Sequence, residues 1–457
     1  MNQRFYLFAA IVSALTALPA VASAQTQTWL SDRKYTEGIG IRVGDFELHP
    51  GAAAEFGYDS NYYRRAPEEN PIGALRFRLT PSFSISTLTK ARRDSAPSTT
   101  QPDFEFRAAI SATYNEFFPI SGGRDETDRA QMSNDRNVSA DLDLRLGIMP
   151  GRTWSGSIYA GVVRALTPSN NGLNADPNGS NNSIHEVDGF RRILPRAGGE
   201  IAYTPGSGLL DWRLGYQFSG TFFESANFNQ LSNIQNQIET RGRWRFLPRT
   251  ALIYDARFGF ITYPNPTGKT ASHPMRAMLG VSGLVTNTFS VQAMIGWGAS
   301  FYTPKPQEDF NSVIGRAEAK WFLAPGPSES ASASLSTISV GFSRDFFDSF
   351  IGTYLERDRG YIDFSYFFGG RFLLVFNGGA GPIVYPKIDA LKLAAFADIR
   401  IDASLFGEYR FKDTFGVNAN VRYNQNISGT SISINSGDPD YFKWNEIEAY
   451  LGFRWFM

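Results

Sequence analysis

The chain has 457 residues, with 44 Lys and Arg against 44 Asp and Glu, so its formal net charge is zero, and it contains no cysteine. A zero net charge gives no overall field to attract nucleic acid, and the missing thiols exclude a disulfide framework, a thiolate metal site and a lipid-modified cysteine. Aromatic residues make up 14% of the chain and it has 43 glycines, a composition typical of barrels in which every second strand residue meets lipid.

The first residues have the three parts of a secretory signal peptide. Met1–Arg4 carries a positive charge, residues 5–20 are apolar, and Ala22-Ser23-Ala24 forms a small-residue cleavage site. We therefore expect residues 1–24 to be removed, which leaves residues 25–45 as a short periplasmic segment. The alternative, an N-terminal membrane anchor, is disfavoured because the apolar run is short for a membrane span.

Beyond this leader, apolar and polar residues alternate with a period of two. Residues 138–148 place Val, Ala, Leu, Leu, Leu and Ile on one face and Ser, Asp, Asp, Arg and Gly on the other, and residues 74–86, 238–246 and 397–405 follow the same pattern. Such alternation puts apolar side chains on one face of a sheet and charges on the other. No later stretch is apolar over the length of a spanning helix. We predict an all-β fold, a transmembrane antiparallel β-barrel of about 18 strands, with about 16 as the alternative. The expected strand centres are Ala53, Phe77, Ile110, Leu142, Tyr159, Glu200, Leu214, Arg241, Arg257, Leu279, Met294, Ala317, Ile338, Ile362, Val375, Ile401, Asn420 and Leu451.

The connectors between these strands alternate between short and long. Short ones lie at 150–152, 205–208, 247–249, 286–288, 369–370 and 412–414, and longer polar ones at 59–73, 119–137, 167–192, 225–236, 264–273, 303–311, 346–357 and 426–444. Outer-membrane barrels have short periplasmic turns and long extracellular loops. The alternation therefore predicts one barrel domain over residues 46–457 in the cell outer membrane, with both termini in the periplasm. Connectors 89–103 and 325–328 are longer than this scheme requires. A soluble all-β domain, the alternative, has no reason to keep the alternation.

The chain ends on a short motif that favours the same assignment. Residues 446–457 alternate to the last position and include Gly452, Phe453, Trp455 and Met457. A final alternating strand that ends in an aromatic residue resembles the signal read by the outer-membrane assembly machinery. Met457 stands where phenylalanine is usual.

The polar faces of the strands carry the candidate functional residues. In a barrel this wide these faces line a channel, where rings of charge set selectivity. Basic residues lead, and the cluster at 241–245 favours an anionic solute or polymer. The alternative is that the charges pair across strands and only hold the lumen in shape. The candidate pore-lining residues are Arg76, Arg78, Asp141, Asp143, Arg145, Arg213, Glu239, Arg241, Arg243, Arg245, Asp255, Arg257, Arg316, Glu318, Lys320, Asp398, Arg400, Asp402, Glu408 and Arg410.

Aromatic doublets lie near several expected strand ends, at 117–118, 222–223, 346–347 and 367–368. We interpret them as girdles at the two lipid interfaces, with a sugar-stacking path in the lumen as the alternative.

No arrangement of residues points to catalysis. The three histidines, His49, His185 and His273, lie far apart in the sequence, and no nucleophile elbow, phosphate loop or dinucleotide fingerprint occurs. The pair Asp141 and Asp143 has arginine neighbours, so an ion-paired wall explains it better than an acid pair does. We expect no enzymatic activity, no metal site and no cofactor.

Residues 44–63 carry the one recognisable family motif, Gly44-x-Phe46-x-Leu48-x-Pro50, followed by Tyr58-Asp59-x-Asn61. This opening resembles that of the β-barrel porin 2 family. The resemblance implies an outer-membrane barrel linked to exopolysaccharide secretion, and similar 18-stranded barrels are polysaccharide conduits.

We therefore expect a pore or conduit for secretion of a polysaccharide. The alternative is a structural outer-membrane component of a multiprotein surface machine, for motility or adhesin anchoring, without free transport. The expected partners are outer-membrane lipid, the barrel-assembly machinery and separate periplasmic secretion or machine components, because residues 25–45 leave no room for periplasmic helical repeats. Nucleic acid is not expected as a partner.

Overall fold

Antiparallel strands make up most of the computed structural model, which describes residues 38–87, 103–165, 191–206, 208–224, 226–265, 269–303, 308–323, 336–349, 352–388, 392–432 and 440–457. Eighteen of the strands form the barrel wall. They are β2 (Phe46–Asp59), β3 (Gly73–Thr87), β4 (Phe104–Ser121), β5 (Asn137–Ile148), β6 (Trp154–Ala165), β7 (Arg192–Tyr203), β8 (Leu210–Phe223), β9 (Asn233–Leu247), β10 (Thr250–Thr262), β11 (Ala271–Thr286), β12 (Phe289–Thr303), β13 (Phe310–Phe322), β14 (Thr337–Asp348), β15 (Tyr354–Phe368), β16 (Phe372–Tyr385), β17 (Phe396–Lys412), β18 (Phe415–Ile427) and β21 (Trp444–Phe456).

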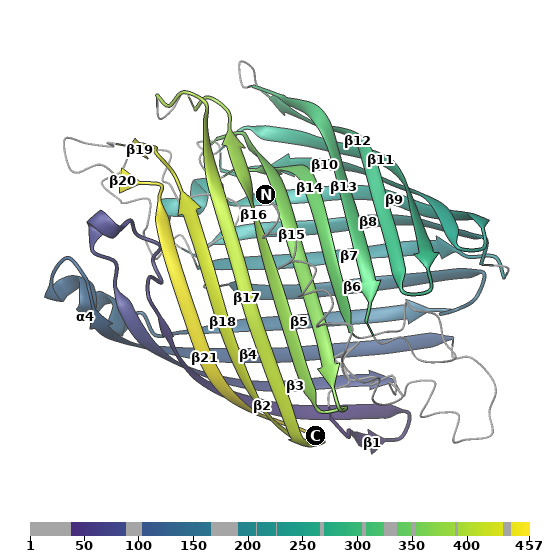
Figure 1. The fold of residues 1–457 in the computed structure, drawn as a ribbon, viewed down its shortest axis with the longest axis horizontal. Coiled ribbons are helices and arrows are strands. Elements are labelled where there is room, and N and C mark those ends of the chain that lie inside the picture. Colours follow the sequence, from purple (N-terminus) through teal and green to yellow (C-terminus); the bar gives the residue numbers. More distant parts are fainter. Residues whose placement is uncertain are drawn as a thin grey trace, which may run out of the picture.

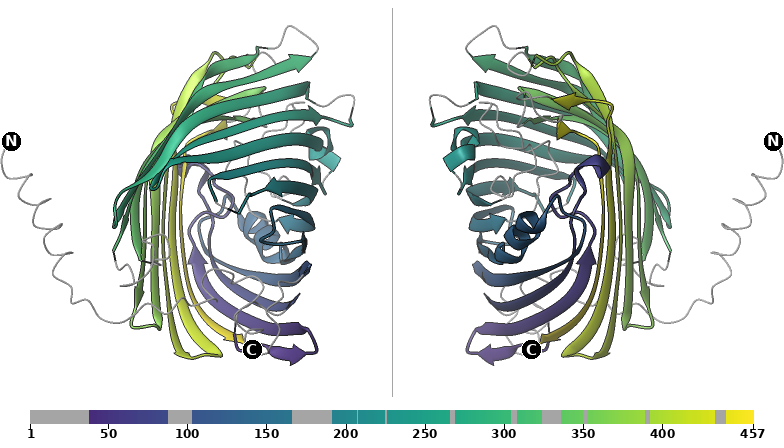
Figure 2. Two further views of the ribbon diagram at one scale, coloured as in Figure 1. Left: turned by 90° about the vertical axis from the view of Figure 1, so that its right-hand side faces the viewer. Right: turned by 90° about the vertical axis from the view of Figure 1, so that its left-hand side faces the viewer.

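The barrel is closed by its first and last strands. Each strand pairs with its neighbour in sequence, and β2 then pairs antiparallel with β21 from Gly51↔Phe456 to Asp59↔Glu448. Closure leaves no unpaired sheet edge, which a membrane-spanning sheet requires. Two of the views show the curved strands wrapping around one interior (Figure 2). All the strand centres expected from the sequence fall inside strands, so the predicted barrel of 18 strands is confirmed.

Short and long connections lie at opposite ends of the barrel. Tight turns join β9 to β10 and β17 to β18, whereas the connections from β2 to β3 and from β4 to β5 are long and carry the short helices η1 (Pro67–Glu69) and α4 (Glu126–Asn134). The C-terminus lies at the turn side, where the Met457 backbone N–H donates to the Pro50 carbonyl at 3.0 Å. Figure 1 shows α4 and the small strands β19 (Ser431–Ile432) and β20 (Asp440–Tyr441) at the other, loop side. The short strand β1 (Ile41–Val43) pairs with the start of β2. The periplasmic position of the turn side stays a prediction, and residues 1–24, 89–102, 167–190 and 325–328 lie outside the described residues.

Alternate residues of each strand present apolar side chains on the outer face. Leu451 is 64% exposed and Ile295 is 68% exposed, and exposed Phe, Leu, Ile and Val recur around the whole wall. Near the turn side, aromatic rings pair across strands, as Trp154 does with Tyr203 at 4.6 Å between centroids and Phe289 with Trp321 at 4.7 Å. An apolar exterior with an aromatic rim is the surface of a transmembrane barrel. No helix in the described part of the chain is long and apolar enough to cross a membrane.

The aromatic doublets fit the girdle interpretation only in part. Phe118 is exposed on the outer face, but its neighbour Phe117 is buried inside the barrel. Phe223 and Phe346 are buried as well. Successive strand residues face opposite sides of a sheet, so a doublet cannot place both rings in lipid, and one ring of each of these pairs packs into an apolar cluster inside the barrel.

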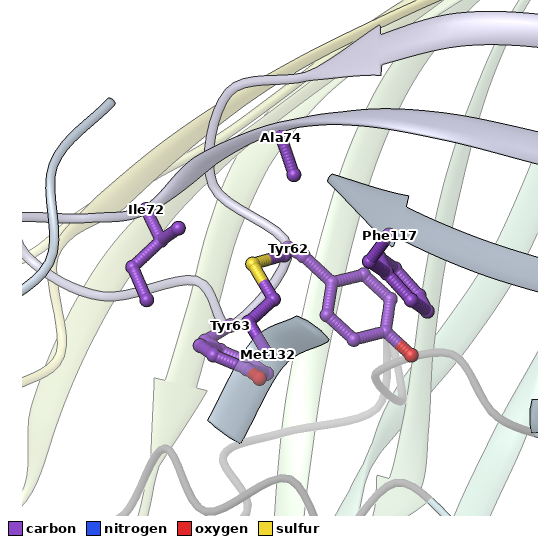
Figure 3. Close-up of a cluster of buried hydrophobic side chains, with 6 residues drawn as sticks. All are labelled: Tyr62, Tyr63, Ile72, Ala74, Phe117 and Met132. Carbon is purple, nitrogen blue, oxygen red and sulfur yellow. The ribbon is translucent and has the colours of Figure 1, made fainter. Parts of the chain in front are cut away.

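Four apolar clusters line the loop side of the barrel interior. One joins Tyr62, Tyr63, Ile72 and Phe117 to Met132 of α4 (Figure 3). The others centre on Phe442 with the ends of β15 and β16, on Phe228 of η3 (Ala226–Leu231), and on Phe310 with Phe346. These contacts bury apolar surface, which is worth roughly 25 cal/mol per Å², and they hold the connections inward over the mouth.

One hairpin leaves the wall and leans into the lumen. Pairing of β13 with β14 stops at Gly315↔Arg344, whereas β14 and β15 stay paired as far as Asp348↔Tyr354. The tip contacts strands across the gap, since the Arg276 Nε donates to Asp345 at 2.8 Å and the Lys269 Nζ to Asp348 at 3.0 Å. The hairpin tip therefore narrows the loop-side mouth.

Candidate functional site

The charged residues proposed from the sequence lie on the face opposite the exposed apolar side chains, which is the lumen side. The register shows this directly, because Arg241 pairs with Asp255, Glu239 with Arg257, and Arg316 with Met294, while their neighbours Ile238 and Ile295 are exposed outside. Whether these residues conduct a solute stays a proposal. The structure gathers many of them into two pockets and several ion-paired rows.

The first pocket, here called the loop-side pocket, has a volume of about 530 Å³. Strands β3, β15, β17, β18 and β21 and the β2–β3 connection build it, and arginines outnumber carboxylates among its residues, seven to three. Its lining residues are Tyr62, Arg64, Arg76, Arg78, Arg357, Arg359, Arg400, Asp402, Ala403, Ser404, Arg422, Asn424, Glu446 and Glu448.

Several of these arginines share carboxylates inside the pocket. The Asp402 carboxylate accepts from Arg357 at 3.0 Å and also from Arg359. The Arg76 Nη1 donates to Asp59 at 2.8 Å and to Glu448 at 3.2 Å. Charge-assisted bonds of this kind fix a guanidinium in place, so these arginines form a rigid basic wall.

The β2–β3 connection places one more arginine over the pocket. The Asn61 side-chain amide donates to the carbonyls of Arg65 and Asn445, at 2.7 and 2.8 Å, which fastens the connection to the start of β21. The Arg64 Nε then donates to Glu446 at 3.1 Å, and its guanidinium carbon lies 4.5 Å from the centre of the Trp444 ring. This loop contribution could not be deduced from strand alternation.

The same connection is held against α4 by a two-pronged ion pair. Arg65 donates to both carboxylate oxygens of Asp128, at 2.5 and 2.7 Å. Burial acts to raise the pKa of Asp128, but the bonds from Arg65 and from the Arg124 backbone N–H outweigh it and lower that pKa below its usual value. Burial raises the pKa of Tyr62, so its hydroxyl stays neutral in the cluster beside the pocket.

The second pocket, here called the turn-side pocket, has a volume of about 490 Å³ and lies beside the β5–β6 turn. Its charged lining residues are Glu105, Arg107, Arg145, Arg152, Glu200, Asp211 and Arg213. Within it the Glu200 carboxylate accepts from Arg213 at 3.0 Å and from Arg241 at 2.5 Å. Arg243 and Arg245 lie farther along β9 toward the turn and make no ion pair within the described part of the chain. The 241–245 cluster is thus one paired arginine and two arginines open to the lumen.

Several of the remaining candidates form ion pairs on other strands. Arg257 pairs with Asp255 at 2.9 Å, and Lys320 with Glu318 at 3.0 Å. Glu408 accepts from Arg410 at 2.9 Å. Asp143 of β5 pairs with Arg196 of β7. The two interpretations drawn from the sequence, charges that pair across strands and charges that line a channel, therefore apply to different residues. Ion pairs hold these strands of the wall together, and an excess of arginine lines the two pockets.

Three carboxylates near the loop-side pocket approach one another closely. One oxygen each of Asp59, Glu446 and Glu448 lies within 4.8 Å of the others, a spacing compatible with a cation. Arg76 and Arg64 already donate to this group. The arrangement is an ion-paired network at the β2–β21 closure, whose acids balance the buried guanidinium.

Sequence reasoning found part of the loop-side pocket and missed the rest. Arg76, Arg78, Arg400 and Asp402 were expected, whereas Arg357 and Arg359 were not, because β15 carries charges on both faces in this stretch. Glu446 and Glu448 could have been predicted from the sequence, since they alternate with the outer-face residues of the last strand. Strands distant in sequence meet here only because the barrel closes.

The chain matches no known family profile and no curated protein. Among solved structures it is similar over 91% of its length to a BenF-like porin from Pseudomonas fluorescens Pf-5, with a TM-score of 0.46, 11% identity and 100% of that chain covered. It is similar in the same way to Pseudomonas aeruginosa OpdQ (TM-score 0.43, 11% identity, 91% and 99% covered). A bacterial polysaccharide outer membrane secretin gives a TM-score of 0.33 at 9% identity, with 91% and 99% covered.

The class of protein follows from the barrel itself. Eighteen antiparallel strands close with no free edge, present apolar side chains outward and enclose a charged interior. Only a lipid environment accounts for such an exterior. The chain is an outer-membrane β-barrel.

Proposed function

We propose that this barrel is an outer-membrane conduit through which a polysaccharide leaves the cell. The observation that carries the proposal is the lumen: it is charged along its length and has an arginine-rich pocket at each side, one beside the turns and one beneath the loops. Barrels of about 18 strands are wide enough for an aqueous channel. Rings of arginine attract anionic solutes and repel cations.

An aromatic side chain on the lumen face supports a sugar polymer over a simple ion as the solute. The Tyr361 hydroxyl donates to Glu318 at 3.1 Å, and the Tyr361 residue is only partly buried. An aromatic ring on the lumen face offers a flat apolar surface to the C–H side of a sugar. Delivery of the polymer would fall to a separate periplasmic partner.

Electrical recording tests the conduit. Purified protein in planar bilayers should form a conducting, anion-selective pore, and Arg243→Glu together with Arg245→Glu should move the reversal potential toward cation selectivity. Arg249→Glu, an exposed position at the turn of the same hairpin, is the matched control and should change selectivity much less. Absence of conductance under any condition would overturn the pore.

A genetic test addresses the polymer. Cells without this chain should lose a surface polysaccharide while other outer-membrane barrels assemble normally, and the wild-type chain should restore it. An unchanged set of surface polysaccharides would overturn the secretion role even if the pore conducts.

The inward-folded loops favour one second candidate, a structural component of a surface machine. Four apolar clusters and the β14–β15 tip hold the loop-side mouth in a defined shape. A barrel that anchors a partner needs such a fixed surface and no through-passage. This candidate predicts no conductance, and loss of motility or adhesion on deletion with the surface polysaccharide intact.

A further inference from the structure

One arginine in the loop-side pocket is buried without an ion pair in the described part of the chain. Arg400 is only 6% exposed, and its Nε has no hydrogen-bond partner in the described ranges. Asp398, two residues away on the same face, accepts instead from the Asn426 side-chain amide at 2.8 Å. Within the described part of the chain, no carboxylate forms an ion pair with Arg400. Burying a charge that is neither paired nor hydrogen-bonded is costly in free energy, so the burial of the Arg400 guanidinium requires an explanation.

The surroundings of Arg400 add positive charge. Its guanidinium carbon lies 4.6 Å from the centre of the Trp444 ring, and Arg64 lies 4.5 Å from the centre of the same ring. Arg357 is a further lining residue, and it shares its carboxylate, Asp402, with Arg359. Like charges repel at this distance, and Glu446 pairs with Arg64 but not with Arg400. The pocket thus has an unpaired positive charge at Arg400, within the part of the chain that the structure describes.

The shape of the pocket suits an oxyanion on a larger molecule. Its volume of about 530 Å³ exceeds what a small ion fills, and it is within the range of ligand sites in proteins. Planar guanidinium groups bind carboxylates and phosphates through paired N–H donors. Tyr62 also lines the pocket, and the buried Trp444 ring packs against the Arg400 guanidinium. These features together describe a site for a charged sugar.

We propose that the loop-side pocket is a binding site for an anionic sugar unit, whose carboxylate or phosphate group pairs with Arg400 between Arg64 and Arg357. This inference rests on the proposed conduit and deepens it, because it names the transported polymer as an acidic polysaccharide. The bound anion supplies the negative charge with which Arg400 pairs. Each acidic unit of the chain would occupy the pocket in turn as the polymer passes.

Calorimetric titration of the purified, folded barrel in detergent tests the site. The probes are trigalacturonate for a carboxylate, inorganic phosphate for a phosphate group, and maltotriose as a neutral sugar of similar size. We expect trigalacturonate or phosphate to bind and maltotriose not to bind. The preferred anion identifies whether the polymer carries uronate or phosphate groups. Lack of binding by both anions overturns the site, as does equally strong binding of maltotriose.

Substitution then places the site at Arg400. Arg400→Gln should weaken binding of the preferred anion at least about tenfold, whereas Arg249→Gln, which removes the same charge at an exposed turn, should leave it unchanged. An equal effect of both variants would mean nonspecific charge attraction and overturn the site.

A second readout keeps the test valid if a variant folds poorly. Without ligand, Arg400→Gln should be at least as thermostable as the wild type, because it removes an uncompensated buried charge. The anion should raise the thermal midpoint of the wild type and not that of the variant. A variant that is destabilised without ligand would show that Arg400 is structural and overturn the assignment.

These measurements do not depend on transport. A barrel that conducts but binds neither anion would remove the site and leave the conduit standing. A barrel that binds anions at Arg400 but neither conducts nor affects surface polysaccharide would remove the conduit and leave the site.

Discussion

Arg76 is the central ion of the seam at which the barrel closes, and its removal should weaken the whole fold. The residue is 4% exposed and donates from β3 to Asp59 of β2 and to Glu448 of β21, at 2.8 and 3.2 Å. Its guanidinium also lies 4.8 Å from the ring centres of Tyr62 and Phe117. One side chain therefore connects both closing strands to the loop cluster.

The size of the effect follows from what Arg76→Met leaves behind. Asp59 is fully buried, and its oxygen would face those of Glu446 and Glu448 within 4.8 Å without the neutralising charge. Breaking a buried ion pair by removing one partner costs about 3–5 kcal/mol. At about 1.4 kcal/mol per factor of ten, the unfolding equilibrium should rise roughly 100- to 5,000-fold.

Urea unfolding in lipid vesicles, followed by the fluorescence of the chain's eight tryptophans, measures the effect. Arg78→Met on the same strand is the matched control, because the Arg78–Glu55 pair is partly exposed, at 18% and 19%, and such pairs are worth about 1 kcal/mol or less. Adding Glu448→Gln to Arg76→Met should recover part of the loss. The reasoning is refuted if Arg76→Met costs less than Arg78→Met, or if Glu448→Gln destabilises the double variant further.

Three further results are expected. Because the pKa of Asp128 is lowered, its bond to Arg65 contributes its full stabilisation above the ordinary carboxyl pKa of about 4. That stabilisation is lost as pH falls through the lowered pKa. A spin label at Ala130→Cys, the only cysteine of that variant, should become mobile only in this acidic range, and Asp128→Asn should make the label mobile at neutral pH. Phe346→Ala should release the β14–β15 tip at a local cost of about 3–5 kcal/mol and raise single-channel conductance, and unchanged conductance would show that the tip does not narrow the pore. Gly296→Ala should lower barrel stability by more than about 1 kcal/mol in the same urea assay, because a Cβ there would lie 1.9 Å from the Ala277 carbonyl oxygen; wild-type stability would show that the two strands can separate freely.

The sequence predicted the wall of the barrel because a strand in this environment obeys a local rule. Lipid on one side and water on the other force a period of two, so residues 138–148 or 397–405 reveal both their strand and their polar face without any partner. Connector length then fixed the order of turns and loops. The rule is local, and one chain suffices to apply it.

Contacts between distant strands were decided only by closure and loop folding. Arg64 reaches its pocket from a loop, Phe117 turns inward because Tyr62 and Met132 lie there, and Arg400 lacks an acid because Asp398 is engaged by Asn426. No periodic signal in the sequence encodes which arginine pairs with a carboxylate, since the pairing depends on the strand register around the closed barrel. The sequence by itself determined which residues face the lumen, and the tertiary structure alone decided which of those charges are neutralised and which lie open to an anion, because Coulomb energy depends on distances that only the closed barrel sets.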